Sequence, residues 1–481
     1  MKKNHNIGKT PFTLYGLSLS TFFERFAFYS VALYLVANLN FYYGMSDTQA
    51  FTVFGSFMAF SFLTPTIGGY LGDQLIGRKA SIGMGLFLIM VGCFLISVNR
   101  VQELYSGLGF LAVGNGLFKP NISALITCIY QDHQERLDSA FTVFYAAINA
   151  GSAISALLLG YLLKTVGYTN SYLLMGATAS LAIVSFLPFV RLNDQKVSCA
   201  EAYRYDSVKF LSVGAGSILL SQIISQIIFR GVETVFLLGF FVFIMGYAGY
   251  IYARQDVLAR KRLIALLFMA VVYMVFCVLY YQAPLSVTLF TKRLVSLDVF
   301  GLDLHPAQFL ALDPIFVVIF GVILSSLWRV LPETHWLAFA PTKYALGLLV
   351  IGIAFFMLIA GCISLEGIHK MNPFWLVMYY FFRSMAELLV IPIGLTIVSK
   401  LSPTQHMSFF MGFWFYFEAF ANYMAGKLSM ISEILDGMST AKEIGIYTSA
   451  FTIYSIIAVF FSIVTIFLID WLKHLGTINT L

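Results

Sequence analysis

Apolar stretches of about twenty residues alternate with short polar segments along the whole chain. Each stretch is long enough to cross a hydrocarbon core of about 30 Å as an α-helix. The pattern predicts fourteen membrane-spanning helices, at 12–37, 50–72, 80–98, 104–129, 140–163, 170–190, 208–229, 233–253, 263–290, 308–330, 344–363, 373–398, 408–431 and 445–472. Because the number is even, both termini are expected on the same side of the membrane.

The longest polar segment, RLNDQKVSCAEAYRYDSVK, follows the sixth predicted span. It divides the chain into a six-helix bundle at 1–192, a linker with two additional helices at 193–260 and a second six-helix bundle at 261–481. The predicted fold is therefore an all-α membrane protein with two bundles plus two extra helices. Two repeated bundles around a central path are typical of secondary transporters.

The composition supports a membrane protein. The chain has 481 residues, of which 59% are hydrophobic and 11% charged, and its mean hydropathy is +0.85. A soluble protein carries about 25% charged residues. The net charge of +6 does not indicate nucleic-acid binding, because the excess positive charge lies in the loops. Eighteen Lys and Arg residues fall on the N-terminal side of the predicted membrane and seven on the other, which predicts that both termini are cytoplasmic.

Charged residues inside the first and fourth spans mark a candidate site. A lone charge at the bilayer centre costs at least about 2.5–3.5 kcal/mol, so it is a functional candidate by default. Glu24 and Arg25 are adjacent in the first span. Neighbouring residues point about 100° apart on a helix, so we expect each to find its partner elsewhere. Lys119 in GNGLFKPNIS is such a partner, and Pro120 loosens the helix beside it.

Four more charged residues fall within later spans. Glu387 and Arg383 lie one turn apart in the twelfth span, Asp313 opens the tenth, and Glu418 lies in the thirteenth. Substrate binding and proton binding are the functional interpretations of such groups. The alternative is that they form buried ion pairs that hold helices together. Arg383 in particular could pair with Glu387 or with another residue.

Other motifs limit the kind of protein. Asp73 and Arg78 in GGYLGDQLIGRK can brace a tight turn between the second and third spans, which indicates a gate or latch. We find no ATP-binding loop of the GxxxxGK[ST] type, no GxSxG and no HExxH. Neither an enzyme, a catalytic site, a metal site nor a cofactor is therefore expected.

Together these strings resemble known families. GGYLGDQLIGR is similar to the signature loop of the major facilitator superfamily. FERFAFY, GNGLFKPNIS, FYAAINAGS and AELLVIPIG resemble the proton-dependent oligopeptide transporter (POT) family of the bacterial type. The resemblance implies the major facilitator fold and import of di- and tripeptides, or peptide-like zwitterions, by proton symport. It also implies a multi-pass protein of the bacterial inner membrane, driven by the proton gradient, with the lipid bilayer and small peptides as partners. We expect a monomer.

The resemblance also assigns roles to residues. Arg25 would receive the peptide carboxylate with Lys119 beside it, Asn149 would bond the peptide backbone, and Glu387 would hold the α-amino group. The substrate-binding candidates are Arg25, Tyr29, Lys119, Asn149, Glu387 and Asp313. The proton-coupling candidates are Glu24, Lys119, Asp313, Glu387 and Glu418. The gating and structural candidates are Gly69, Asp73, Gly77, Arg78, Pro120 and Tyr281.

The chain departs from the family pattern at several positions. Thr21 stands where the family has a glutamate commonly assigned to proton binding. Ala32 and Tyr281 stand where the family has an arginine and a glutamate that form a gate pair, and Asp313 replaces an asparagine. Either the proton site has moved to another carboxyl group, or tight coupling has been lost.

Two alternatives to peptide symport remain at this point. One is an uncoupled facilitator, or a carrier of another small zwitterion or anion, on the same fold. The other is a non-transporting peptide-binding receptor on that fold.

Overall fold

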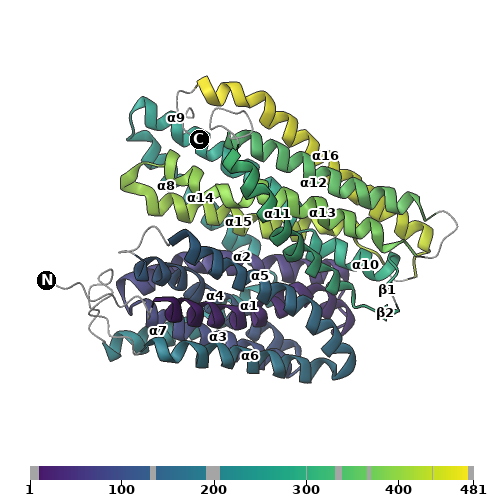
Figure 1. The fold of residues 1–481 in the computed structure, drawn as a ribbon, viewed down its shortest axis with the longest axis horizontal. Helices are drawn as coiled ribbons and strands as arrows, with labels where there is room; N and C mark the ends of the chain where they lie inside the picture. Colours follow the sequence, from purple (N-terminus) through teal and green to yellow (C-terminus); the bar gives the residue numbers. More distant parts are fainter. Residues whose placement is uncertain are drawn as a thin grey trace. The chain divides into compact units, whose positions relative to one another are not determined.

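The computed structural model describes residues 10–130, 137–190, 206–299, 301–330, 339–365, 370–435 and 437–474. These residues are almost entirely helical (Figure 1). The helices are α1 (Thr10–Phe41), α2 (Asp47–Gln74), α3 (Arg78–Ser97), α4 (Val101–Ile129), α5 (Leu137–Thr165), α6 (Gly167–Val190), α7 (Ser207–Arg230), α8 (Glu233–Ala253), α9 (Val257–Tyr280), α10 (Thr288–Leu294), α11 (Leu312–Val330), α12 (Ala340–Ile363), α13 (Pro373–Val390), α14 (Gly394–Leu401), α15 (Met407–Ser429) and α16 (Thr440–His474). Two strands of two residues each, β1 (Asp298–Val299) and β2 (Leu302–Asp303), pair antiparallel and form the sheet of the described residues.

All fourteen predicted spans coincide with helical segments. Twelve of these segments, among the described residues, are long and apolar enough to cross a membrane. The predicted spans 104–129 and 408–431 fall on α4 and α15, which are helical over 29 and 23 residues but carry several polar residues. The chain is therefore a multi-pass membrane protein. Helices suit this setting because a helix satisfies its own backbone hydrogen bonds where lipid offers no partners.

Two of the spans are interrupted. Between α9 and α10 the chain forms a π-helical turn at Ala283–Val287, in which Leu285 has φ −100° and ψ −110°. Between α13 and α14 it forms a 3₁₀ turn at Ile391–Ile393. Each turn contains a proline, which lacks the backbone N–H that an α-helix uses. Each interruption begins about one helical turn after a residue of the candidate site, Tyr280 before Ala283 and Glu387 before Ile391.

The chain forms two compact units. Unit 1 contains residues 1–34 and 60–230, and unit 2 contains residues 35–59 and 231–481. The boundary therefore crosses α1 and α2, and the tip of their hairpin belongs to unit 2. α7 belongs to unit 1 and α8 to unit 2, while the predicted separate linker at 193–260 stays a prediction.

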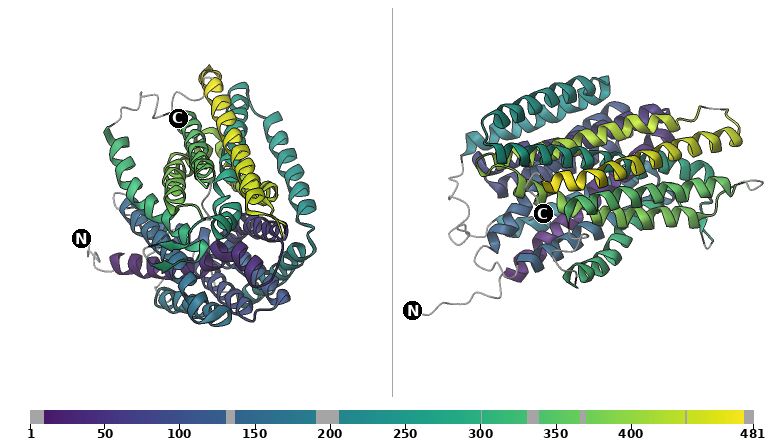
Figure 2. Two further views of the ribbon diagram at one scale, coloured as in Figure 1. Left: turned by 90° about the vertical axis from the view of Figure 1, so that its right-hand side faces the viewer. Right: turned by 90° about the horizontal axis from the view of Figure 1, so that it is seen from above.

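Within each unit most helices lie side by side with their axes roughly parallel (Figures 1 and 2). In unit 1, α3 packs against α4 and α6, and α7 packs against α4. In unit 2, α16, yellow in Figure 1, lies along α12, which also packs against α13, while α15 packs against α9.

Within unit 1, α2 and α4 meet backbone to backbone. A Cβ atom built on Gly68 would overlap the carbonyl oxygen of Gly116, and one built on Gly116 would lie 2.6 Å from Thr64. Two hydrogen bonds join the helices at this contact: Thr64 Oγ1 donates to the Ala112 carbonyl at 2.7 Å, and Asn121 Nδ2 donates to the Gly68 carbonyl at 2.9 Å. Small residues at helix contacts allow this close approach in membranes.

Gly68→Ala is expected to destabilise the protein, because the new methyl group would overlap backbone atoms that cannot rotate away. Overpacking of this kind costs about 1–3 kcal/mol. The measurement is the thermal unfolding midpoint of the purified protein in detergent. Gly216→Ala on α7 is the matched control, since a Cβ there meets nothing within 4 Å. Equal midpoints for the two variants would contradict this account of the contact.

Candidate functional site

Unit 1 buries the two adjacent charges of α1 as a direct ion pair. Arg25 Nε donates to Glu24 Oε2 at 2.5 Å, and Arg25 Nη2 donates to Glu24 Oε1 at 2.6 Å. The carboxylate side chain is 0% exposed and the guanidinium side chain 6%. The prediction that these neighbours cannot satisfy each other is therefore wrong. Their Cβ atoms do point apart, but the three methylene groups of arginine let its planar fork turn back onto the carboxylate.

Asn115 on α4 holds this ion pair in place. Arg25 donates to Asn115 Oδ1 at 2.6 Å, and Asn115 Nδ2 donates to the Ser61 carbonyl on α2 at 2.9 Å. Sequence reasoning missed Asn115, although it lies within GNGLFKPNIS. The available signal was a single amide side chain between two glycines of an apolar helix.

Lys119 follows one turn later on α4. Lys119 is exposed, and its ammonium nitrogen lies 4.9 Å from the centre of the Phe62 ring. Lys119 was predicted to be the buried partner of Glu24, but the direct partner of Glu24 is Arg25. Its charge still acts on Glu24 through space. The cluster of Glu24, Arg25 and Lys119 carries one negative and two positive charges.

Aromatic rings and a third helix complete this cluster. The Arg25 guanidinium carbon lies 4.9 Å from the Phe28 ring centre and 5.6 Å from that of Tyr29, which is half-buried. A Cβ on Gly151 would lie 3.1 Å from Arg25 Cβ, so α5 packs directly on α1 at this level. Asn149 lies on that part of α5, half-buried, and its amide donates to the Tyr145 carbonyl at 2.9 Å.

Two positions of α1 at which the chain departs from the family pattern, Thr21 and Ala32, are buried. Thr21 is 1% exposed, and its hydroxyl donates to the Leu17 carbonyl of its own helix at 2.9 Å. Ala32 is 2% exposed. Neither position offers a titratable group in unit 1.

Unit 2 brings three predicted charges together around one tyrosine. The Tyr280 hydroxyl at the end of α9 lies 2.8 Å from Glu387 Oε2 of α13 and 3.3 Å from Asp313 Oδ2 of α11. Arg383 forms an ion pair with Asp313, not the alternative pair with Glu387. Its guanidinium lies 3.7 Å from the Tyr280 ring centre. Tyr280 itself was missed, because nothing in an apolar, aromatic helix distinguishes it from its neighbours.

Glu418 on α15 forms a separate contact. The Tyr281 hydroxyl donates to Glu418 Oε1 at 3.1 Å, and Glu418 is 7% exposed. A tyrosine at the family's glutamate position thus binds a carboxylate that the family pattern does not contain.

The predicted latch between α2 and α3 has the expected contact. Arg78 Nε donates to Asp73 Oδ1 at 2.8 Å, and Arg78 also bonds Cys128 Sγ of α4 at 2.8 Å. Gly77 turns the chain with φ +82°, a conformation that favours glycine. The two charged side chains are 25% and 48% exposed, so the pair contributes about 0–1 kcal/mol. A Cβ on Gly69 would lie 3.6 Å from Pro120. Gating by this turn stays a prediction.

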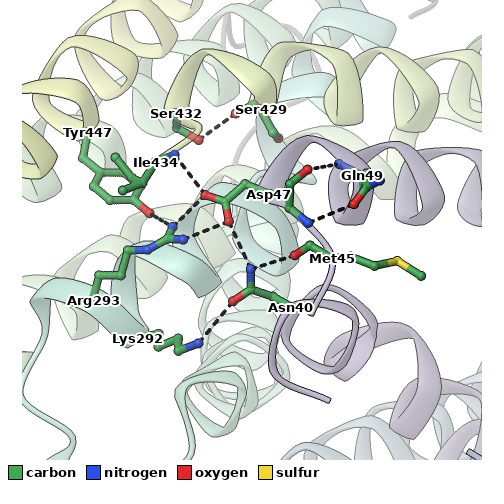
Figure 3. Close-up of polar contacts among 11 residues, drawn as sticks. Asn40, Met45, Asp47, Gln49, Lys292, Arg293, Ser429, Ser432, Ile434 and Tyr447 are labelled. Atoms are coloured by element: carbon green, nitrogen blue, oxygen red, sulfur yellow. Dashed lines mark hydrogen bonds and ion pairs between the residues drawn. The ribbon is translucent and has the colours of Figure 1, made fainter. Parts of the chain in front are cut away.

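A further ion pair, which was not expected from the sequence, lies in unit 2 at the tip of the α1–α2 hairpin (Figure 3). Arg293 at the end of α10 binds both oxygens of Asp47 at 2.7 and 2.9 Å, and the Tyr447 hydroxyl at 2.7 Å. The backbone N–H of Ile434 also donates to Asp47, at 3.2 Å. The Asp47 side chain is 1% exposed.

Asn40 extends this network. Its amide donates to Asp47 Oδ1 at 3.2 Å, and its carbonyl oxygen accepts from Lys292 at 3.1 Å. The Lys292 ammonium also lies 3.5 Å from the Phe41 ring centre. The hairpin tip is thereby fixed to α10 and to the start of α16.

Long apolar helices with buried charged clusters are typical of a secondary transporter, and the fold is of the major facilitator type. The chain belongs to the POT family, whose model matches residues 79–446. The resemblance inferred from the motifs is thereby confirmed.

Named relatives are similar over almost the whole chain. A dipeptide and tripeptide permease A from Citrobacter koseri is 33% identical, covering 92% of this chain and 89% of that protein. A dipeptide and tripeptide permease B from Xenorhabdus bovienii is 27% identical, covering 99% of each.

Solved structures have the same fold. The structure of tetrameric PepTSo2 matches with a TM-score of 0.84 and 26% identity, covering 97% of this chain and 99% of that one. A bacterial homologue of the human drug peptide transporters PepT1 and PepT2 matches with a TM-score of 0.83 and 26% identity over the same shares.

Proposed function

We propose that this protein is a secondary active transporter that imports di- and tripeptides together with protons by alternating access. The carrying observation is the chemistry of the two clusters. The unit 1 cluster has two cations for one carboxylate, and the unit 2 cluster has two carboxyl groups for one cation. A peptide is a zwitterion, and its carboxylate fits the first kind of cluster while its ammonium group fits the second.

The assignments within this proposal follow the chemistry of each group. Arg25 and Lys119 bind the peptide carboxylate, with Tyr29 and Asn149 contacting the backbone. Glu387 binds the ammonium group beside Asp313. The names of the permease relatives support the substrate class. The protein needs no cofactor, because the proton gradient supplies the energy.

The cellular setting is part of the same proposal. The protein lies in the bacterial inner membrane with both termini in the cytoplasm, which the distribution of Lys and Arg supports. The monomeric state expected from the sequence stays a prediction.

Proteoliposome uptake of labelled dialanine tests the proposal. We expect accumulation that requires an inward proton gradient and stops when an uncoupler is added. Equilibration without accumulation would identify an uncoupled facilitator, and binding without flux would identify a receptor. Absence of both flux and binding for any zwitterionic peptide would overturn the peptide substrate class.

Lys119→Gln is expected to reduce this uptake, because it removes one of the two cations proposed to bind the carboxylate. The measurement is the initial rate against peptide concentration, where a raised KM is expected. Lys164→Gln is the matched control, since Lys164 is an exposed cation in the last turn of α5. Equal KM values for the two variants would contradict the assignment of Lys119.

A further inference from the structure

The hydroxyl group of Tyr280 contacts two carboxyl groups at once. Glu387 Oε2 lies 2.8 Å from it and Asp313 Oδ2 3.3 Å. A phenol has one hydrogen, so it can donate to one of these oxygens at a time. If both carboxyl groups were ionised, the other oxygen–oxygen contact would hold no hydrogen, and two like charges would lie together.

Asp313 is the carboxyl group held in its ionised form. Arg383 forms an ion pair with it, and the Ser384 hydroxyl donates to its Oδ1 at 2.8 Å. Arg383 is fixed in turn by a bond from its Nε to the Tyr280 carbonyl at 3.2 Å and by its place over the Tyr280 ring. Among the described residues, no ion pair joins a cation to Glu387.

Two arrangements of hydrogens satisfy the Tyr280 contacts, and the ion pair between Arg383 and Asp313 selects one of them in the substrate-free protein. Glu387 carries a proton and donates it to the Tyr280 oxygen, while Tyr280 donates its own hydrogen to ionised Asp313. The cluster then has one negative charge, on Asp313, and one positive charge, on Arg383. Buried charges that balance in this way avoid the cost of an unpaired ion.

Other groups around Glu387 do not change this assignment. The titratable and charged groups that unit 2 places around the cluster, in its described part, are Tyr273, Cys277 and Tyr280 of α9, Tyr281 directly after α9, Asp313 of α11, Tyr344 of α12, Tyr379, Tyr380 and Arg383 of α13, and Glu418 of α15. Glu418 is bound by Tyr281. Arg383 is the cation of this set and is paired with Asp313.

We infer that Glu387 carries the transported proton in the substrate-free protein, and that Tyr280 passes it to Asp313 when a peptide ammonium group binds Glu387. In this step the Glu387 O–H bond breaks and its proton goes to the Tyr280 oxygen. The Tyr280 hydrogen moves to Asp313 at the same time, so one proton is transferred and none is lost. The inference rests on the proposed function and assigns its coupling site.

This relay keeps proton and peptide bound together. Ionised Glu387 pairs with the ammonium group, and Asp313 holds the proton. It also accounts for the replacement of the family's asparagine by Asp313, because an asparagine at that position could not accept the proton. Thr21 in unit 1, which has no titratable group, is then no obstacle to coupling.

Tyr280→Phe tests the relay, because it removes the hydroxyl and keeps the ring beneath Arg383. In proteoliposomes that contain a pH-sensitive dye, we expect labelled dialanine to exchange across the membrane while gradient-driven accumulation and peptide-dependent proton entry are lost. Tyr344→Phe is the control: its hydroxyl is buried without a hydrogen-bond partner among the described residues, and full coupling is expected. Coupling in Tyr280→Phe equal to wild type would overturn the relay.

A second measurement does not depend on transport. Infrared difference spectroscopy of the full chain in lipid, with and without dialanine, is expected to show a protonated carboxyl group that is absent in Glu387→Gln. Peptide binding is expected to shift this band in the wild type and to remove it in Asp313→Asn. A band unaffected by Glu387→Gln would overturn the assignment. A wild type that has the band but transports no peptide would contradict the proposed function instead.

Discussion

Arg25→Gln is expected to abolish peptide uptake and to destabilise the protein. The change removes the cation proposed to bind the peptide carboxylate, and it leaves the fully buried Glu24 carboxylate without its bidentate partner. Breaking a buried pair by removing one partner costs about 3–5 kcal/mol. Dialanine uptake in proteoliposomes and the thermal unfolding midpoint in detergent measure the two effects.

The double variant with Glu24→Gln and Arg25→Gln separates the loss of uptake from the loss of stability. Removing both charges leaves no buried ion, so the unfolding midpoint is expected to return close to that of the wild type. Uptake is expected to stay absent, because the binding cation is still missing. Uptake restored together with stability would show that Arg25 has a structural role alone.

Arg293→Gln is expected to lower the stability of the protein strongly. Asp47, whose side chain is 1% exposed, would lose both of its bonds to the guanidinium group. The expected cost is again about 3–5 kcal/mol, seen as a lower unfolding midpoint.

Two further variants complete this experiment. Arg78→Gln is the matched control, since it breaks an ion pair of similar length whose side chains are partly exposed, and a cost of about 0–1 kcal/mol is expected. Adding Asp47→Asn to Arg293→Gln is expected to recover most of the lost stability. If Arg293→Gln and Arg78→Gln had equal midpoints, the buried pair would not hold the hairpin tip.

The helical spans could be predicted from the sequence because membrane thickness sets one length scale for all of them. Hydrophobic length alone located α8 at Glu233–Ala253, as predicted. The interruption at Leu285 could not be predicted, since a proline in a membrane helix is compatible with both a straight and a broken backbone.

The charged members of the candidate site were predicted, but Asn115, Tyr280 and the contacts among the residues were not. Charges in apolar helices identified Glu24, Arg25, Asp313 and Glu387, because such groups are rare there. Which groups pair depends on side-chain length and helix packing, and neither is encoded in local periodicity. Arg293 and Asp47 are 246 positions apart in the sequence, and each lies next to a turn where charged residues are ordinary.

The contact between α2 and α4 also has a mechanical consequence. Most helix pairs are separated by a layer of side chains that can change rotamer and so absorb small displacements. At Gly68 and Gly116 that layer is absent. We therefore expect α2 and α4 to move together at this contact. Lys119 lies on α4 one turn beyond Gly116, and α2 leads directly into the Asp73–Arg78 turn. A displacement of α4 at Gly116 is therefore expected to move α2, and with it the Asp73–Arg78 turn.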